Sequence, residues 1–226
     1  MREIVIDTET TGLDHKSGDR IIEVACVELK NHVQTGNNLQ FYCNTEKKIS
    51  EEAFKTHGLS REFLKNHPTF KDQFKNFLQF IEGDKLIIHN SDFDMGFLNN
   101  ELALVGEKKL QNEVVDTIKL ARQVLNTRIA NLDYLCKRFS IDLSKRKFHG
   151  ALLDCQLLAE VYLELLGGRQ TALNLDNSKK NIEKNTNKLD DIDKKINKIE
   201  LSEQDIQEHK KFISDLKNAM WHKVDY

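Results

Sequence analysis

Short apolar runs alternate with longer amphipathic stretches along the first 168 residues. The apolar runs predict β-strands over residues 3–7, 21–29, 39–43, 86–88 and 114–115. Apolar positions three and four residues apart predict helices over residues 70–81, 95–104, 117–125, 132–139 and 150–166, and a short helix capped by Ser50. We expect Thr35–Asn38 to form the turn of an antiparallel hairpin between the second and third strands. Strands that alternate with helices after an initial hairpin indicate an α/β domain with a mixed sheet.

The pattern changes after Gly168, where core-forming residues become rare. Residues 176–198 are mostly Lys, Asn and Asp, which is typical of a disordered linker. The three- and four-residue spacing of Leu189, Ile192, Ile196 and Ile199 alternatively fits a marginal helix that needs a partner.

The last stretch of the chain regains a helical pattern. A capping-type start at Ser202 is followed by one apolar face, made by Ile206, His209, Phe212, Ile213 and Leu216. A tail this short cannot bury such a face alone, so we expect it to dock onto another protein. The predicted organisation is a domain over residues 1–169, a polar flexible linker over 170–200 and a helical tail over 201–226.

Composition narrows the function classes. Lys and Arg number 34 against 36 Asp and Glu, a net charge of -2, which excludes a bulk-electrostatic nucleic-acid binder. Four scattered cysteines without a CxxC motif predict small buried side chains in a reducing cytosol. No signal peptide and no apolar run of about 20 residues is present, so we expect a cytoplasmic protein without a membrane span.

Two carboxylates follow the first apolar run. Asp7 and Glu9 are two residues apart, so on a strand they project from the same face. Two like charges on one face repel each other unless a cation lies between them. The first strand therefore predicts half of a metal site.

Three more residues are candidates for the same site. Asp94 follows the strand at residues 86–88, although capping the next helix is an alternative role for it. Asp154 lies on the leucine face of its helix and therefore points toward the sheet, where it needs either a cation or a salt bridge. His149 precedes that helix, and we expect it to hang over the carboxylates, where an imidazole can deprotonate a water. A surface-loop histidine is the alternative.

An oxygen-rich cluster without cysteine selects hard ions, Mg²⁺ or Mn²⁺. Three or four carboxylates suffice for two ions roughly 4 Å apart, which is the arrangement that clamps the attacking and leaving oxygens in phosphoryl displacement. Metal-dependent phosphodiester chemistry is the expected function.

Three stretches resemble the exonuclease motifs of the DEDDh family of 3′–5′ exonucleases. They are DTETTG (residues 7–12), HNSDFD (89–94) and HGALLD (149–154). Flanking segments extend the resemblance over about residues 2–170, and within the family it is closer to the epsilon (proofreading) subunits of bacterial DNA polymerase III. It implies an RNase H-like exonuclease fold, with a mixed central sheet flanked by helices.

The resemblance also implies roles for these residues. Asp7, Glu9 and Asp154 would bind the metals, Asp94 would complete the site partly through water, and His149 would activate the attacking water. The expected reaction removes mismatched 3′-terminal nucleotides from DNA as 5′-monophosphates. The residues expected to contact the substrate are Asp7, Glu9, Thr10, Thr11, Glu52, His57 and Asp154.

Some of these assignments leave alternatives open. From the sequence alone, Glu52 is equally an ordinary acid at a helix start, and His57 an ordinary turn residue. Asp92 departs from related sequences, which often carry a small apolar residue there, and we expect it to face solvent. A stand-alone exonuclease acting on RNA ends or oligonucleotides, and a non-catalytic replisome adaptor, are the alternative functions.

The resemblance implies partners as well. Besides the DNA 3′ end, these are the polymerase III alpha subunit, bound through residues 201–226, and a small third core subunit whose existence the sequence leaves open. Gln170–Leu175 resembles peptides that insert into bacterial sliding clamps, although such short patterns often arise by chance and an ordinary linker start is the favoured alternative.

Overall fold

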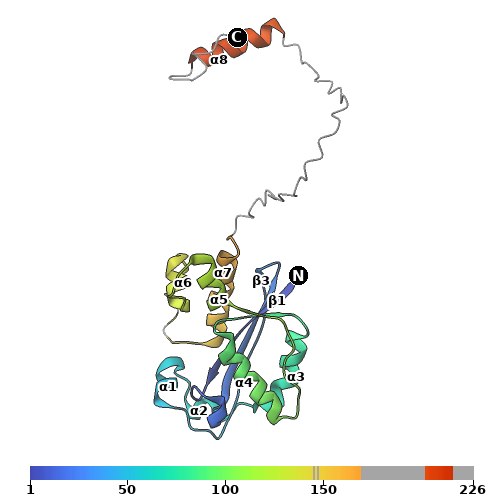
Figure 1. Cartoon of the computed structure of the whole chain (residues 1–226), viewed down its shortest axis with the longest axis vertical. Coiled ribbons are helices and arrows are strands. Elements are labelled where there is room, and N and C mark those ends of the chain that lie inside the picture. Colours follow the sequence, from blue (N-terminus) through green and yellow to red (C-terminus); the bar gives the residue numbers. More distant parts are fainter. Residues whose placement is uncertain (145, 147, 169–201, 216–226) are drawn as a thin grey trace, which may run out of the picture. The chain divides into compact units, whose positions relative to one another are not determined.

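A five-stranded mixed sheet organises the first part of the chain (Figure 1). This computed structural model describes residues 1–144, 146, 148–168 and 202–215. The strands run in the order β3-β2-β1-β4-β5. Their bounds are β1 (Arg2–Thr10), β2 (Ile21–Lys30), β3 (Val33–Tyr42), β4 (Lys85–Ile88) and β5 (Val114–Asp116). β1, β2 and β3 pair antiparallel, while β1, β4 and β5 pair parallel, which confirms the mixed α/β sheet.

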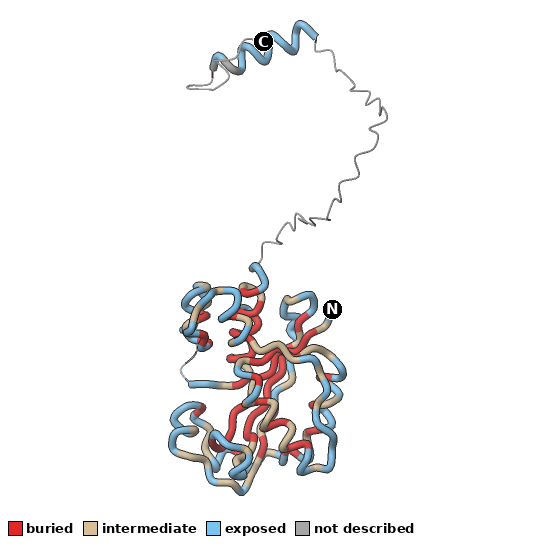
Figure 2. Tube along the Cα trace, viewed as in Figure 1, coloured by how far each residue is buried: buried red, intermediate tan, exposed pale blue. Residues whose placement is uncertain are grey.

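Helices cover both faces of the sheet. On one face, Val5 and Ile87 pack against residues of α5 (Thr117–Leu125), α6 (Leu132–Arg138) and α7 (Ala151–Leu165). On the other face, Ile4, Ile6 and Ile88 pack against α3 (Phe70–Ile81) and α4 (Ser91–Leu104). Figure 2 shows the buried residues gathered along the strands and the inner sides of these helices. Burial on both faces explains why residues 86–88 of β4 are all apolar.

Two predictions about the strands were wrong. β1 extends to Thr10, beyond the predicted end at residue 7, and pairs with β2 as far as Ile21, so Glu9 as well as Asp7 lies within the strand. The hairpin turn is at Asn31 and His32, both with positive φ, as a two-residue turn of this hand requires. The segment predicted as the turn, Thr35–Asn38, belongs to β3, an exposed edge strand.

Short elements and helix caps complete the domain. α1 (Glu51–His57) is capped by Ser50 as predicted, and Asp116 accepts hydrogen bonds from the first turn of α5. A 3-10 turn (His15–Ser17) and α2 (Arg61–Leu64) were not predicted. The cysteines are free and buried, as expected.

The chain divides into two compact units, Met1–Asn174 and Leu175–Tyr226. In the second, the structure describes α8 (Glu203–Asp215) and the predicted capping at its start, where the Asp205 amide donates to Ser202 Oγ. Ile206 and Phe212 on this helix are exposed, and docking of its apolar face onto another protein stays a prediction. Among the described residues no helix is long and apolar enough to cross a membrane. Predictions on Gln170–Leu175, the linker, Leu216 and beyond lie outside the described residues.

Candidate active site

β1 delivers Asp7 and Glu9 to the face of the sheet that α7 covers. Val5, which shares their face by strand alternation, packs in the same apolar cluster as α7. Glu9 is buried and stands opposite Glu23 of β2 in the antiparallel register. Like charges directly opposite each other destabilise a sheet. Glu23 is thus a further carboxylate beside the proposed metal ligands, and sequence reasoning missed it.

Asp94 reaches the same site from the opposite side of the sheet. It lies in the first turn of α4, which begins at Ser91, four residues earlier than predicted, and its N-cap is Asn90. The alternative of Asp94 as a helix cap is therefore wrong. Its buried carboxylate accepts a 2.7 Å hydrogen bond from the Thr8 hydroxyl. Thr8 lies between Asp7 and Glu9 and points to the other face, which ties α4 to the strand that carries the carboxylates.

Asp154 of α7 is buried and turned toward the sheet, as its place on the leucine face predicted. Arg146 binds it bidentately, with Nε 2.6 Å from Oδ1 and Nη2 2.7 Å from Oδ2. The same guanidinium donates to Asp133 Oδ1 at 2.5 Å. Of the two alternatives raised for Asp154, the structure therefore shows the salt bridge, while metal binding by Asp154 stays a prediction.

His149 lies beside Asp154, as the sequence predicted. Its Nδ1 is 3.3 Å from Asp154 Oδ2 and 2.8 Å from Arg146 Nη2, and its side chain is 47% exposed. Its backbone amide donates to Thr56 O, which fixes the loop before α7 against α1. Because Nδ1 faces these two partners within the described part of the chain, Nε2 is the nitrogen available to a solvent molecule.

The crowded carboxylates hold protons more tightly than usual. Burial, followed by the charges of Asp94 and Glu9, raises the pKa of Asp7 well above its ordinary value. Burial and Glu23 raise the pKa of Glu9 to about 8, and burial raises that of Asp94 to about 7. For Asp154 burial acts in the same direction, but hydrogen bonds from Arg146 and His149 hold its pKa below the usual value.

These donors fit a divalent cation. One ligand atom from each of Glu9, His149 and Asp154 lies within 4.8 Å of the others. Buried carboxylates with raised pKa values lack a compensating positive charge, and a hard oxygen-binding ion supplies one. Arg146 supplies part of that charge at Asp154, so a cation that binds Asp154 would compete with its guanidinium.

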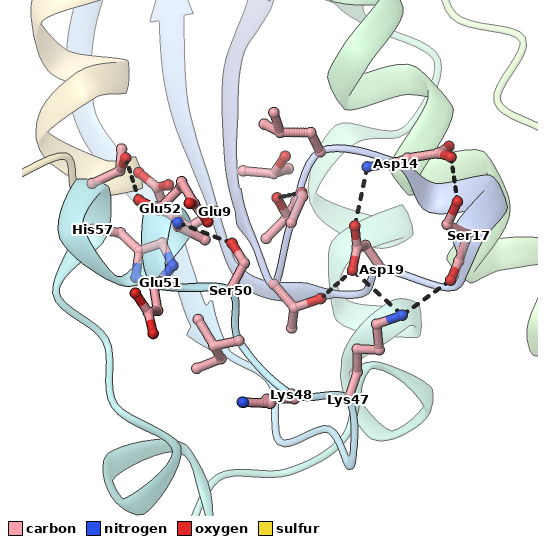
Figure 3. Close-up of a pocket in the computed structure, with 18 of the residues that line it drawn as sticks. Glu9, Asp14, Ser17, Asp19, Lys47, Lys48, Ser50, Glu51, Glu52 and His57 are labelled. Carbon is pink, nitrogen blue, oxygen red and sulfur yellow. Dashed lines mark hydrogen bonds and ion pairs between the residues drawn. The ribbon is translucent and has the colours of Figure 1, made fainter.

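A groove of about 930 Å³ leads away from Glu9. Figure 3 shows Glu9, Glu52 and His57 at one end, and Lys47 with Asp19 and Ser17 at the other. His57 is buried, its Nδ1 accepts from the Leu59 amide, and burial lowers its pKa. Its Nε2 is buried and has no hydrogen-bond partner among the described residues, although a weaker contact with the Thr10 backbone partly offsets the effect of burial on the pKa.

The two threonines after Glu9 line the groove, but their hydroxyls are engaged within the turn. Thr10 Oγ1 donates to Gly12 O at 2.6 Å, and Thr11 Oγ1 donates to Asp19 and accepts from the Arg20 amide. Their hydroxyls shape the turn around the groove.

Arg146 is, after Glu23, the second functional candidate that sequence reasoning missed. The available signal was the basic run Lys145–Lys147, in which Arg146 lies three residues before His149. Asp92 faces solvent as predicted, with a side chain that is 86% exposed and 3.6 Å from Lys119.

The metal-free protein is expected to lose stability as pH rises from about 5 to about 8. The raised pKa values of Glu9 and Asp94 mean that the folded state keeps protons that the unfolded state releases above about pH 4.5. Urea unfolding across this interval measures the effect, and Mg²⁺ should remove it by replacing the protons. Glu9→Gln is the control and should show a weaker pH dependence. A wild-type stability that rises over the interval would contradict the prediction.

Arg146→Ala is expected to destabilise the metal-free protein by about 3–5 kcal/mol, because it leaves the Asp154 carboxylate buried without its cation. Mg²⁺ should recover most of this loss. Urea unfolding with and without Mg²⁺ measures both effects. Arg138→Ala, which removes an exposed arginine of α6, is the matched control. Equal unfolding midpoints for the two variants without metal would refute the role given to Arg146.

Comparison with known proteins places this site in context. A sequence model of the family described as Exonuclease matches residues 4–162. The DNA polymerase III subunit epsilon of Rickettsia felis is 43% identical over 224 residues, covering 96% of this chain and 97% of its own. The Escherichia coli K12 subunit of the same name is 43% identical over 176 residues, covering 74% and 72%.

Solved structures share the fold at lower identity. Exonuclease X in complex with 5′ overhanging duplex DNA aligns with a TM-score of 0.59 and 21% identity, covering 73% of this chain and 90% of that one. The nuclease domain of 3′hExo, a DEDDh family member bound to rAMP, aligns with a TM-score of 0.64 and 19% identity, covering 73% and 91%. The sheet is therefore that of an RNase H-like exonuclease. Identity across nearly its full length, together with the family match, places this chain in the DNA polymerase III epsilon subunit family of exonucleases.

Proposed function

We propose that this chain is the proofreading 3′–5′ exonuclease subunit of a bacterial replicative DNA polymerase III, and that it hydrolyses mismatched 3′-terminal nucleotides to 5′-monophosphates. The observation that carries the proposal is the meeting of Glu9, His149 and Asp154 within 4.8 Å at the head of a groove. The near full-length similarity to epsilon subunits supports the choice of DNA as substrate and of a polymerase as partner.

The carboxylates are proposed to have different roles in metal binding. We infer that Asp7, Glu9 and Asp154 hold two Mg²⁺ or Mn²⁺ ions and that Asp94 completes the site. When bound, such ions stabilise the charge that develops on the attacking and leaving oxygens. In the metal-free site, burial and mutual repulsion both disfavour the charged carboxylates. A bound cation offsets both effects, so the site favours cation binding.

His149 is proposed as the general base, acting at Nε2. For Nε2 to accept a proton from water, Nδ1 must carry the ring hydrogen and donate it to Asp154 Oδ2. The Arg146 N–H that now faces Nδ1 must then move away, because two donors cannot share one hydrogen bond. Withdrawal of Arg146 from Asp154 would therefore permit metal binding and set the tautomer of His149 at the same time.

The groove is proposed to hold the terminal nucleotide. Glu52 and His57 lie near Glu9, and the unpartnered Nε2 of His57 is suited to a sugar or phosphate oxygen. Thr10 and Thr11 would contact the nucleotide through the backbone and methyl groups of their turn, because their hydroxyls are already bonded.

The remaining parts of the chain are proposed to serve assembly in the bacterial cytoplasm. We infer a catalytic domain over residues 1–169, a linker over 170–200 and a docking tail over 201–226 that binds the polymerase alpha subunit. The exposed Ile206 and Phe212 of α8 support this docking role. Clamp binding through Gln170–Leu175 and a third core subunit remain parts of the proposal.

The proposed function is tested by comparing digestion of a mispaired DNA primer with that of an RNA oligomer of the same sequence. Faster release of 5′-monophosphates from the DNA supports proofreading. Preferential digestion of the RNA would instead support a stand-alone exonuclease, and inactivity on both together with no Mg²⁺ or Mn²⁺ binding would support a silent adaptor.

The tail is tested by pull-down of the purified polymerase alpha subunit with the full chain and with a chain lacking residues 176–226. Loss of binding on truncation supports the assignment. Retained binding would contradict it without affecting the exonuclease activity itself.

A further inference from the structure

A second hollow opens beside the catalytic groove. Its volume is about 560 Å³, and its walls are Lys48, Ile49, Ser50, Glu51, Phe54, Lys55, Ser60 and Arg61. The first four of these residues also line the groove, so the two spaces are continuous. Figure 3 shows Lys48 and Glu51, two of the shared residues, from the groove side.

This side hollow is positively charged. Lys48, Lys55 and Arg61 form no side-chain hydrogen bond or ion pair with any described residue, and they face a single carboxylate, that of Glu51. The other end of the groove differs. There Lys47 is engaged by Ser17 O at 3.0 Å and Asp19 at 3.6 Å, and Asp14 adds a further negative charge. An anionic strand leaving the groove is attracted toward the side hollow and repelled at the other end.

An aromatic ring lies among these cations. Phe54 of α1 is 47% exposed, and the side hollow is the space that its ring borders. An exposed ring between lysine and arginine side chains is the combination that binds single-stranded nucleic acid, in which bases stack on the ring and phosphates pair with the cations.

We propose that the side hollow binds the single-stranded segment immediately upstream of the 3′ end, with Phe54 stacking on a base and Lys48, Lys55 and Arg61 holding its phosphates. The inference rests on the proposed exonuclease function. If the side hollow binds DNA in this way, the preferred substrate has an unpaired 3′ segment that reaches beyond the terminal nucleotide into the side hollow. A properly paired end must fray over that length before it is cut, so the side hollow makes the enzyme sensitive to how easily the end unpairs.

The test compares two substrates of the full-length chain, a single-stranded DNA hexanucleotide and the p-nitrophenyl ester of thymidine 5′-monophosphate, which reaches only the metal centre. The double variant Lys55→Glu/Arg61→Glu should raise the KM for the hexanucleotide about tenfold or more at moderate salt. It should also reduce the salt dependence of log KM by roughly 0.7 for each phosphate that the variant no longer neutralises.

Phe54→Ala should raise the same KM by roughly tenfold and leave the salt dependence unchanged. Hydrolysis of the ester should be unaffected in both variants.

Lys71→Glu/Lys137→Glu is the matched control, since it makes the same change in net charge on exposed positions of α3 and α6. A hexanucleotide KM in Lys55→Glu/Arg61→Glu equal to that of the control would overturn the inference and leave the side hollow to another occupant, such as a protein subunit. Failure of the wild-type chain to hydrolyse either substrate would instead overturn the proposed function, so the two failures are distinguishable.

Discussion

Replacing Asp7 with Asn is expected to abolish release of 3′ nucleotides while making the metal-free protein more stable. The amide keeps the shape of the side chain but removes a charge that the proposed metal ions need. Loss of several kcal/mol of transition-state stabilisation corresponds to a rate decrease of about a thousandfold or more. Without metal, the same charge is repelled by Asp94, Glu9 and Asp154. Its removal therefore relieves repulsion that the wild-type protein carries until a cation binds.

Two measurements check this prediction. Nucleotide release from a mispaired primer gives the activity, and urea unfolding in the presence of a chelator gives the stability. Asp92→Asn is the matched control, because Asp92 is a neighbouring carboxylate that faces solvent. It should change neither quantity appreciably. An Asp7→Asn protein that retains full activity would refute the metal-binding role of Asp7.

The second large effect is expected for His149→Ala, which should lower kcat by about 10²- to 10⁴-fold, the usual contribution of a general base. Its metal affinity and its stability should remain close to those of the wild type. The side chain is half exposed, and Asp154 keeps its two hydrogen bonds to Arg146 when the imidazole is removed.

Single-turnover kinetics and a Mg²⁺ titration separate these effects for His149. His149→Gln serves as the companion variant, because its side chain can still hydrogen-bond to Asp154 or Arg146 but cannot take up a proton from water. It should be as slow as His149→Ala. If Gln restores most of the rate, His149 positions the site rather than acting as its base.

The contrast between the two variants follows from where the charges lie. Asp7 belongs to a buried cluster whose electrostatics affect both folding and metal binding, whereas His149 stands at the exposed edge of that cluster. A loss of activity accompanied by a gain in stability should therefore be specific to the buried carboxylates.

Hydrophobic periodicity was sufficient for most of the elements. The face shared by Asp154, Leu157 and Val161 places the carboxylate against the sheet, and α7 buries that face as predicted. The continuous run Leu86–Ile88 identified a strand that is covered on both sides. These predictions succeeded because burial of one helix face, or of both strand faces, requires apolar residues at regular positions along the chain.

Hydrophobic periodicity did not predict the strand bounds where a strand is exposed or carries polar residues. β3 is an edge strand with six exposed residues at its start, so Thr35–Asn38 resembles a turn although it lies within β3, where Asn38 pairs with Val27 of β2. β1 continues past Asp7 because its polar residues face a functional site rather than a core, and polarity there was mistaken for the end of the strand.

The sequence by itself determined the chemistry of the site: Asp7 and Glu9 on one strand face, Asp154 on a leucine face, and His149 just before its helix. Only the tertiary structure decided how these groups are charged and paired. Strand register places Glu23 opposite Glu9, a hydrogen bond from Thr8 ties in Asp94 across 86 residues, and Arg146 binds Asp154. Residue spacing determines the direction in which side chains point within one element. The distance between charges on different elements depends instead on how those elements pack. That distance sets the pKa values of the carboxylates and their affinity for a cation.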